Sequence, residues 1–141
     1  MAHQYSATAS ANPESLVTLE VEGLASIESG PPKEFGGSGE QWSPEDLLVS
    51  AVADCFVLSF KAVATASKFQ WTSLSCSVTG TLDKVDRAMQ FTALSIKPTL
   101  TVPADADVDR AHKLLEKSEQ VCFITHSLKA DTELEVDVKV A

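Results

Sequence analysis

The residues most able to do chemistry in this chain of 141 residues are its three cysteines, Cys55, Cys76 and Cys122. A cysteine acts as a nucleophile only as a thiolate, which requires a nearby cation, hydrogen-bond donor or helix N-terminus. A free cysteine is also among the residue types most often buried in protein cores. Each cysteine therefore has a catalytic and a structural interpretation, which the surrounding sequence has to separate.

Cys55 and Cys122 are the two candidates for thiol chemistry. Cys55 lies about three turns inside a predicted helix, too far from the start of that helix for its dipole to activate the thiol. Cys122 follows a second predicted helix, where a short turn would leave a thiol some mobility. Such a pair fits an attacking and a resolving thiol only if the fold brings the two together. Cys76 alternates with Leu74 and Val78, so we assign it to the core of a strand, with no chemical role.

Metal binding and cofactor chemistry have little support in the sequence. His126 lies four residues after Cys122, but two side chains are too few for a metal site. An odd number of widely spaced cysteines without a CxxC pair does not fit a secreted disulfide framework or a zinc ribbon. Phosphate-binding and HExxH motifs are also missing. We therefore expect no metal and no bound cofactor.

The charge of the chain argues against several kinds of partner. Lys and Arg total 11 and Asp and Glu total 20, a formal net charge of −9. Nucleic acid and anionic lipid both demand clustered positive charge, so neither is expected as a partner. The apolar segment 47–66 contains Asp54 and Lys61, which favours a buried helix over a membrane span. With no signal-peptide pattern in its first residues, a cytoplasmic protein with reduced thiols is expected.

A long helix is predicted to carry Cys55. Ser43 can cap its first turn, Pro44 suits its first position, and the acidic Glu45 and Asp46 suit its positive end. The apolar residues of segment 44–66 point in nearly every direction. We therefore expect this helix to be enclosed by a sheet on one side and by another element, such as the same helix of a second copy, on the other.

The remaining chain alternates between strands and a second helix. Apolar alternation predicts two short strands within 15–29, a strand at 74–82, a strand at 90–102 and a strand at 128–140. The predicted turn between the middle pair covers 83–89, and the second helix covers 105–121. We expect a single domain over 1–141, with residues 1–13 as a loose arm. The fold class is α+β with an antiparallel sheet and a long central helix.

Four short stretches of this sequence carry a family resemblance. They are Phe35-Gly36-Gly37, Ser43-Pro44-Glu45-Asp46-Leu47-Leu48, Ala51-Val52-Ala53-Asp54-Cys55-Phe56 and Cys122-Phe123-Ile124-Thr125-His126-Ser127-Leu128. In this order they resemble the OsmC/Ohr family, named after osmotically inducible protein C and the organic hydroperoxide resistance protein. The resemblance implies an OsmC-like fold in an intertwined homodimer, with two active sites at the subunit interface.

The resemblance also implies a thiol peroxidase that reduces organic hydroperoxides. Cys55 would attack the O–O bond and become a sulfenic acid, and Cys122 would resolve it as a disulfide. A small or protein-bound dithiol would then reduce the disulfide, without a bound cofactor. This sequence of states follows the known oxidation ladder of cysteine.

Glu45 aligns with the active-site glutamate of the family. It lies ten residues before Cys55, which is ~15 Å along a helix. One chain could not bring the two side chains together, so a shared site requires Glu45 from an antiparallel helix of a second copy. The alternative is that Glu45 only complements the helix dipole.

Two departures from the family leave a second function open. The family has an arginine near the chain start, whereas this chain has none before Arg87; Lys33 could replace it only as a point charge. Phe123 also stands where the family has proline. The alternative function is a non-catalytic protein that binds an apolar small molecule at a dimer interface lined by Phe35, Phe56 and Phe123.

Overall fold

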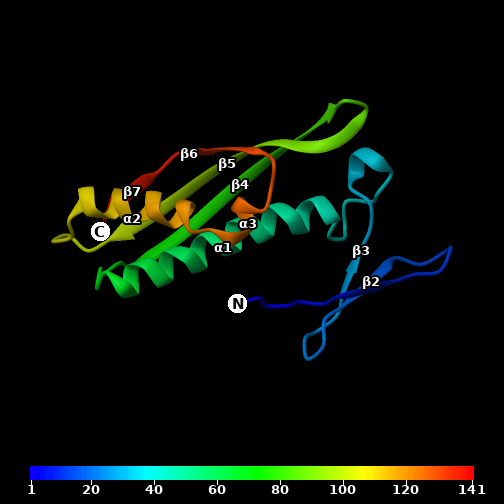
Figure 1. The fold of residues 1–141 in the computed structure, drawn as a ribbon, viewed down its shortest axis with the longest axis horizontal. Helices are drawn as coiled ribbons and strands as arrows, with labels where there is room; N and C mark the ends of the chain where they lie inside the picture. Colours follow the sequence, from blue (N-terminus) through cyan, green and yellow to red (C-terminus); the bar gives the residue numbers. More distant parts are fainter. The chain divides into compact units, whose positions relative to one another are not determined.

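The computed structural model describes residues 1–141, and its contacts divide the chain into two compact units, Met1–Leu48 and Val49–Ala141. Helix α1, Pro44–Ala66, begins in the first unit and continues into the second (Figure 1). The expected single domain over 1–141 stays a prediction. The predicted α+β class is confirmed by the elements of the two units.

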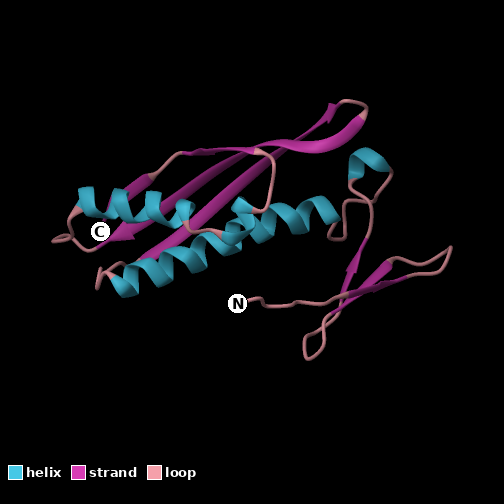
Figure 2. Cartoon of the chain, in the orientation of Figure 1, coloured by secondary structure: helices cyan, strands magenta, loops and turns pink.

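The first unit is a small antiparallel sheet with strand order β1-β2-β3. Its strands are β1 (Thr8–Ser10), β2 (Val17–Glu20) and β3 (Ile27–Ser29) (Figure 2). The two strands predicted within 15–29 are confirmed, with Gly23 at a φ of 82° between them. β1 falls within the segment predicted as a loose arm. Its Thr-Ala-Ser sequence has no apolar alternation, and pairing with β2 makes it an edge strand.

The sheet of the first unit buries little apolar surface. Val17 and Leu19 of β2 are half-buried, whereas Leu24 and Ile27 are exposed. The following loop makes a 3-10 turn, η1 (Lys33–Phe35), which ends at Gly36 in the left-handed region. A Cβ atom at Gly37 would lie 1.8 Å from the carbonyl oxygen of Pro31, so only glycine fits this tight loop.

The start of α1 is capped as its sequence predicts. The backbone N–H of Asp46 donates to Ser43 Oγ at 3.1 Å, and the backbone N–H of Ser43 donates to Asp46 Oδ2 at 3.2 Å. This reciprocal pair satisfies two donors that the first turn of a helix leaves free. The predicted helix over 44–66 is confirmed.

The second unit is a four-stranded mixed sheet with α1 and α2 (Val108–Gln120) on one face (Figure 1). β4 (Ser73–Val85) and β5 (Ala88–Val102) form a long antiparallel hairpin. β6 (Asp131–Leu134) and β7 (Asp137–Val140) then pair one after the other with β5, both parallel to it. The antiparallel prediction therefore holds for the hairpin and for the first unit, but not for the final strands.

Three predicted boundaries in the second unit are wrong. The turn predicted over 83–89 is only Asp86-Arg87, whose φ angles of 49° and 72° suit a two-residue hairpin. The strand predicted over 128–140 is divided into β6 and β7. α2 starts three residues later than expected because Asp107 is its N-cap, with its side chain accepting from the N–H of Arg110 at 3.1 Å.

The core of the second unit lies between the two helices and β5. Val52, Phe56, Phe60 and Ala64 form a stripe along α1 with no exposed surface, and it packs with buried residues of β5 and α2. Trp71 packs edge-on against Phe60, with ring centroids 5.4 Å apart. α1 has the length and apolar composition of a membrane span, and 22% of its most apolar 18-residue window is buried in the chain, so the predicted buried helix is found only along this stripe.

The face of α1 opposite this stripe is not covered within the chain. Leu58 is 58% exposed there, and Lys61 and Ala62 are exposed as well. The expected enclosure on both sides is therefore found on one side only.

Candidate functional site

Cys55 lies in the middle of α1, on the half-buried flank between the core stripe and the exposed face. Its Sγ atom is 4.0 Å from Oγ of Ser59, one turn further along the helix. Residues four apart on a helix share a face, which makes Ser59 a hydrogen-bonding partner of the thiol.

Cys122 is fully buried at the junction of two helices. α2 ends just before it, and Cys122 is the N-cap of the short helix α3 (Phe123–His126). The hydroxyl of Thr125 donates to Cys122 Sγ at 3.1 Å. The turn expected after the second helix therefore takes the form of a single helical turn that holds the sulfur in place.

The fold brings the side chains of Cys55 and Cys122 close enough for each thiol to change the pKa of the other. The two residues come from different helices and are distant in sequence, so this contact depends on how α3 lies beside α1. Both cysteines are free thiols. The proximity that a resolving pair requires is therefore present in the reduced chain.

The surroundings of the pair have opposite effects on the two thiols. Burial raises the pKa of Cys55, but the backbone N–H of Ile124, the Cys122 thiol, the Ser59 hydroxyl and the N–H of Phe123 together lower it below its ordinary value. Each of these groups can donate a hydrogen bond to a thiolate and so favours the charged form. Cys55 is thus the thiol of the pair that ionises first.

Cys122 is held as a neutral thiol. Burial raises its pKa, and the charge on Cys55 raises it further, whereas the hydroxyl and N–H of Thr125 lower it; the net change is upward. A negative charge on one sulfur disfavours a second charge beside it. The pair therefore consists of a thiol whose pKa is lowered and a thiol whose pKa is raised.

Cys76 stays protonated on β4. Burial and then the charge on Cys122 raise its pKa to about 11. Its side chain packs against the hydrophobic core, as the alternation in the sequence predicts. A thiol with so high a pKa is a poor nucleophile at neutral pH because almost none of it is ionised.

Glu45 lies in the first turn of α1, within the first unit. Asp46, and not Glu45, makes the capping hydrogen bonds with Ser43. The Oε1 atom of Glu45 is buried and has no hydrogen-bond partner in the chain. A buried carboxylate oxygen without a partner is costly, so a donor such as water or a second chain would stabilise this side chain. Its role beside the thiols stays a prediction.

The predicted substitute cation, Lys33, also belongs to the first unit. Its methylene chain lies against Gly39, where a Cβ atom would be 3.2 Å from Lys33 Cε. Its proposed place beside Cys55 stays a prediction. In the second unit, the groups that lower the pKa of Cys55 are backbone, thiol and hydroxyl donors, and none is a cation.

The aromatic residues predicted to line the alternative ligand site differ in their exposure to solvent. Phe56 belongs to the core stripe and has no exposed surface, so it cannot line an open pocket. Phe123, in contrast, is 81% exposed, and Phe35 in the first unit is also exposed. The expectation for Phe56 is therefore wrong, because its position on α1 faces the sheet.

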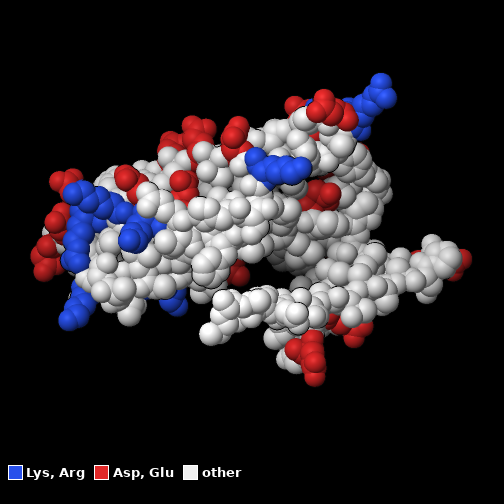
Figure 3. Space-filling model, in the orientation of Figure 1, with Lys and Arg blue, Asp and Glu red and all other residues white.

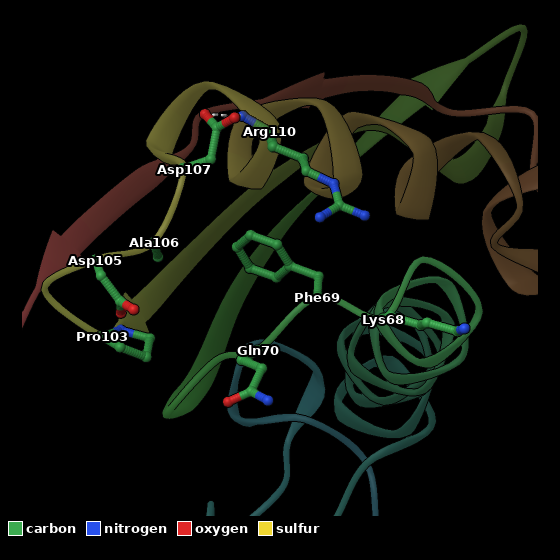
Figure 4. A pocket seen from close by; sticks show the side chains of 8 residues that line it. All are labelled: Lys68, Phe69, Gln70, Pro103, Asp105, Ala106, Asp107 and Arg110. Atoms are coloured by element: carbon green, nitrogen blue, oxygen red, sulfur yellow. Dashed lines mark hydrogen bonds between the residues drawn. The ribbon is translucent and has the colours of Figure 1, made fainter.

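A charged cavity of about 350 Å³ lies at the far end of α1 from its start (Figure 4). Arg110 projects from the first turn of α2 over the ring of Phe69, 5.7 Å from its centroid, and donates to the carbonyl of Ser67. Lys68 and Gln70 continue the lining. None of the three cysteines borders this cavity, so it is separate from the thiol pair.

Charged side chains of both signs lie on the face of the molecule that Figure 3 draws. On the face drawn in Figure 3, Lys and Arg are interrupted by Asp and Glu, and no continuous basic stripe appears. No group of three or more His, Cys, Asp and Glu side chains is arranged to hold a metal ion. His126 instead forms a hydrogen bond with the carbonyl of Gln120.

Sequence reasoning identified both thiols but missed the donors around them. Ser59 and Thr125 lie four and three residues after their cysteines, a spacing that shares a helix face and could have been noticed. The N–H groups of Phe123 and Ile124 carry no sequence signal. Their position depends on the path of the backbone after α2.

Known proteins are similar to this chain in sequence. The family model described as "OsmC-like protein" matches residues 37–137. An uncharacterised protein of Bacillus subtilis, YmaD, is 28% identical over 112 residues, which cover 77% of this chain and 75% of YmaD. Peroxiredoxin OsmC of Escherichia coli is 29% identical over 97 residues, covering 69% of this chain and 67% of that protein.

Solved structures show the same fold. The organic hydroperoxide resistance protein OsmC of Legionella pneumophila superimposes with a TM-score of 0.76, covering 99% of this chain and all of that one. The two sequences are 20% identical. This similarity confirms the predicted OsmC-like fold.

Proposed function

Because the chain belongs to the OsmC-like protein family, we propose that it is a thiol peroxidase that reduces organic hydroperoxides with Cys55 and Cys122. The observation that carries this proposal is the contact between a thiol of lowered pKa and a buried thiol of raised pKa. The name of its E. coli relative, a peroxiredoxin, supports the same class of reaction.

In the first step the thiolate of Cys55 attacks the terminal oxygen of the hydroperoxide. An S–O bond forms, the O–O bond breaks, and the alkoxide leaves with a proton from solvent as an alcohol. Cys55 is oxidised to a sulfenic acid and the peroxide is reduced. The lowered pKa of Cys55 supports this step because it increases the fraction of this thiol that is ionised.

In the second step Cys122 attacks the sulfur of Cys55. An S–S bond forms, the S–O bond breaks, and the hydroxyl group leaves as water after taking up the proton of Cys122. An external dithiol then reduces the disulfide by exchange, returning two electrons to the pair. No bound cofactor is needed for this cycle, and a reducing compartment such as the cytoplasm would supply the dithiol.

A second copy of the chain is part of the proposal. The exposed face of α1 around Leu58 offers a surface on which an antiparallel α1 could pack. Glu45, with its unpartnered buried oxygen, would then meet donors from the partner chain. The proposed active unit is therefore a homodimer.

The proposal is tested by adding one equivalent of cumene hydroperoxide to the fully reduced protein and mapping disulfides by peptide mass spectrometry. A rapid Cys55–Cys122 disulfide is expected, formed faster than with hydrogen peroxide. The Cys76→Ser variant is the matched control and should form the same bond. Cys55→Ser should stay reduced, and Cys122→Ser should stop at the sulfenic acid.

The second candidate function is binding of an apolar small molecule without chemistry. The exposed ring of Phe123, directly beside the thiol pair, is the observation that favours it. If Cys55 and Cys122 stay reduced with excess hydroperoxide while an apolar ligand protects Cys55 from alkylation, the binding function holds and the peroxidase does not.

A further inference from the structure

We propose that His126 is a positioning residue that fixes α3 to the end of α2, so that the backbone N–H groups of Phe123 and Ile124 face the sulfur of Cys55. The inference deepens the proposed function and rests on Cys55 as its nucleophile. His126 itself touches neither sulfur.

The anchor is a hydrogen bond between the His126 ring and the end of α2. Nε2 of His126 bonds to the carbonyl oxygen of Gln120, the last residue of α2. Carbonyl groups in the last turn of a helix lack the partners they would have inside it. Because the carbonyl can only accept, Nε2 must carry the proton, in either the neutral or the charged ring.

α3 is held at its start by the buried Cys122, whose N–H donates to the carbonyl of Glu119 at 3.3 Å, so the anchor is needed at its far end. α3 is a single turn of four residues, none of which is buried. An isolated helical turn this short is not stable by itself. The hydroxyl of Ser127 bonds to the carbonyl of Phe123, and Thr125 bonds to Cys122, but both contacts stay within the same local turn. The His126 bond ties it to α2.

The position of α3 matters for chemistry because hydrogen bonds weaken steeply with poor geometry. The N–H groups of Ile124 and Phe123 come from the first turn of α3, and both lower the pKa of Cys55. The titratable group that faces Cys55 is Cys122, which in turn interacts with Cys76. Releasing the far end of α3 would weaken the hydrogen bonds from the N–H groups of Phe123 and Ile124 to Cys55, although both groups would still be present.

The test compares His126→Leu with His126→Gln in the reduced full-length protein. Glutamine can still donate to the Gln120 carbonyl, whereas leucine cannot. The readout is the pH dependence of Cys55 alkylation by iodoacetamide, followed on the Cys55 peptide by mass spectrometry. His112→Gln, on the part-exposed side of α2, is the matched control.

In His126→Leu, iodoacetamide should alkylate Cys55 roughly three- to tenfold more slowly near neutral pH, because one hydrogen bond is lost. The midpoint of the plot of alkylation rate against pH should move to higher pH. His126→Gln and His112→Gln should stay close to the parent. An unchanged profile in a folded His126→Leu protein, or an equal loss in His126→Gln, would overturn the inference.

If His126→Leu does not fold, His126→Asn decides the question. Asparagine keeps a donor but is too short to reach the carbonyl of Gln120. His126→Asn should therefore slow the alkylation of Cys55. A pH profile like that of the parent protein contradicts the inference. No peroxide enters these measurements. If the protein shows the His126 effect but has no peroxidase turnover, the proposed function is refuted and the inference about His126 stands.

Discussion

Three thiols in one small unit behave differently because their donors differ. Two backbone N–H groups, the Cys122 thiol and the Ser59 hydroxyl lower the pKa of Cys55. Cys122 has only the hydroxyl and the N–H of Thr125, and Cys76 has no donor among the causes of its raised pKa. Burial alone would raise the pKa of all three. The local hydrogen bonds, and not the depth of each side chain, therefore decide which sulfur is reactive.

Replacing Thr125 with valine should slow disulfide closure and spare the reaction with peroxide. The Thr125 hydroxyl is the side-chain donor to Cys122 Sγ, and hydrogen bonds to charged groups contribute about 1.5–3 kcal/mol. We expect closure to be at least about tenfold slower in Thr125→Val. Rapid-quench alkylation after one equivalent of hydroperoxide separates the two steps. Thr132→Val, exposed on β6, is the control, and an unchanged closure rate in Thr125→Val would contradict this role.

Cys76 should make the folded protein less stable as the pH rises from 9 to about 11. The folded state keeps the proton on Cys76 over this window and the unfolded state releases it, so the free energy of unfolding falls with rising pH. Because Cys76 is only partly buried, the expected loss is on the order of 1 kcal/mol. Urea unfolding of the parent and Cys76→Ala across the window measures it. Parallel pH profiles for the two proteins would refute the effect.

At the scale of the elements, two local capping motifs fix the ends of α1. The Ser43–Asp46 pair closes its start, and a Schellman motif closes its end. There the N–H of Phe69 donates to the carbonyl of Ala64 at 2.9 Å and the N–H of Lys68 to that of Thr65 at 3.1 Å. Cys55 thus sits in a helix whose two boundaries are set by its own sequence.

Lys68 is a strained member of this motif, and glycine should be better there. Its φ of 54° lies in the left-handed region, which costs a residue with a Cβ atom about 1 kcal/mol. Lys68→Gly should therefore raise the free energy of unfolding by about that amount, measured by denaturant titration. Lys113→Gly, exposed in the middle of α2, should lower it by about 1 kcal/mol. Destabilisation by both glycines would show that the turn carries no strain.

At the scale of the whole molecule, the exposed face of α1 predicts the oligomeric state. Leu58→Asp should convert the proposed dimer into a monomer, because a charge buried in an apolar interface is strongly unfavourable. Light scattering after size exclusion measures the mass, and circular dichroism checks the fold. Met89→Asp is the control, since Met89 is similarly exposed at the β4–β5 hairpin. A parent-sized Leu58→Asp protein would exclude this face as the interface.

The sequence predicted those parts of the fold that depend on local patterns. The cap at Ser43, the apolar run of α1 and the alternation in β4 and β5 are each contained in a few residues, and each prediction is confirmed. The parallel pairing of β6 and β7 depends on where the chain returns after α3, which no local pattern encodes. The same limit applies to the site: two cysteine motifs were recognisable, but their backbone donors were not.

Each unit contains one of the two tryptophans, and their surroundings differ. Trp42 of the first unit is 48% exposed, whereas Trp71 of the second packs edge-on against Phe60. Indole emission shifts to longer wavelength when water reaches the ring, so Trp42→Phe leaves a fluorescence signal that reports on the second unit alone. Trp71→Phe leaves one that reports on the first. Two coincident melting curves would mean that the halves of the chain unfold as one cooperative body, and two separate curves would mean that the small sheet opens by itself.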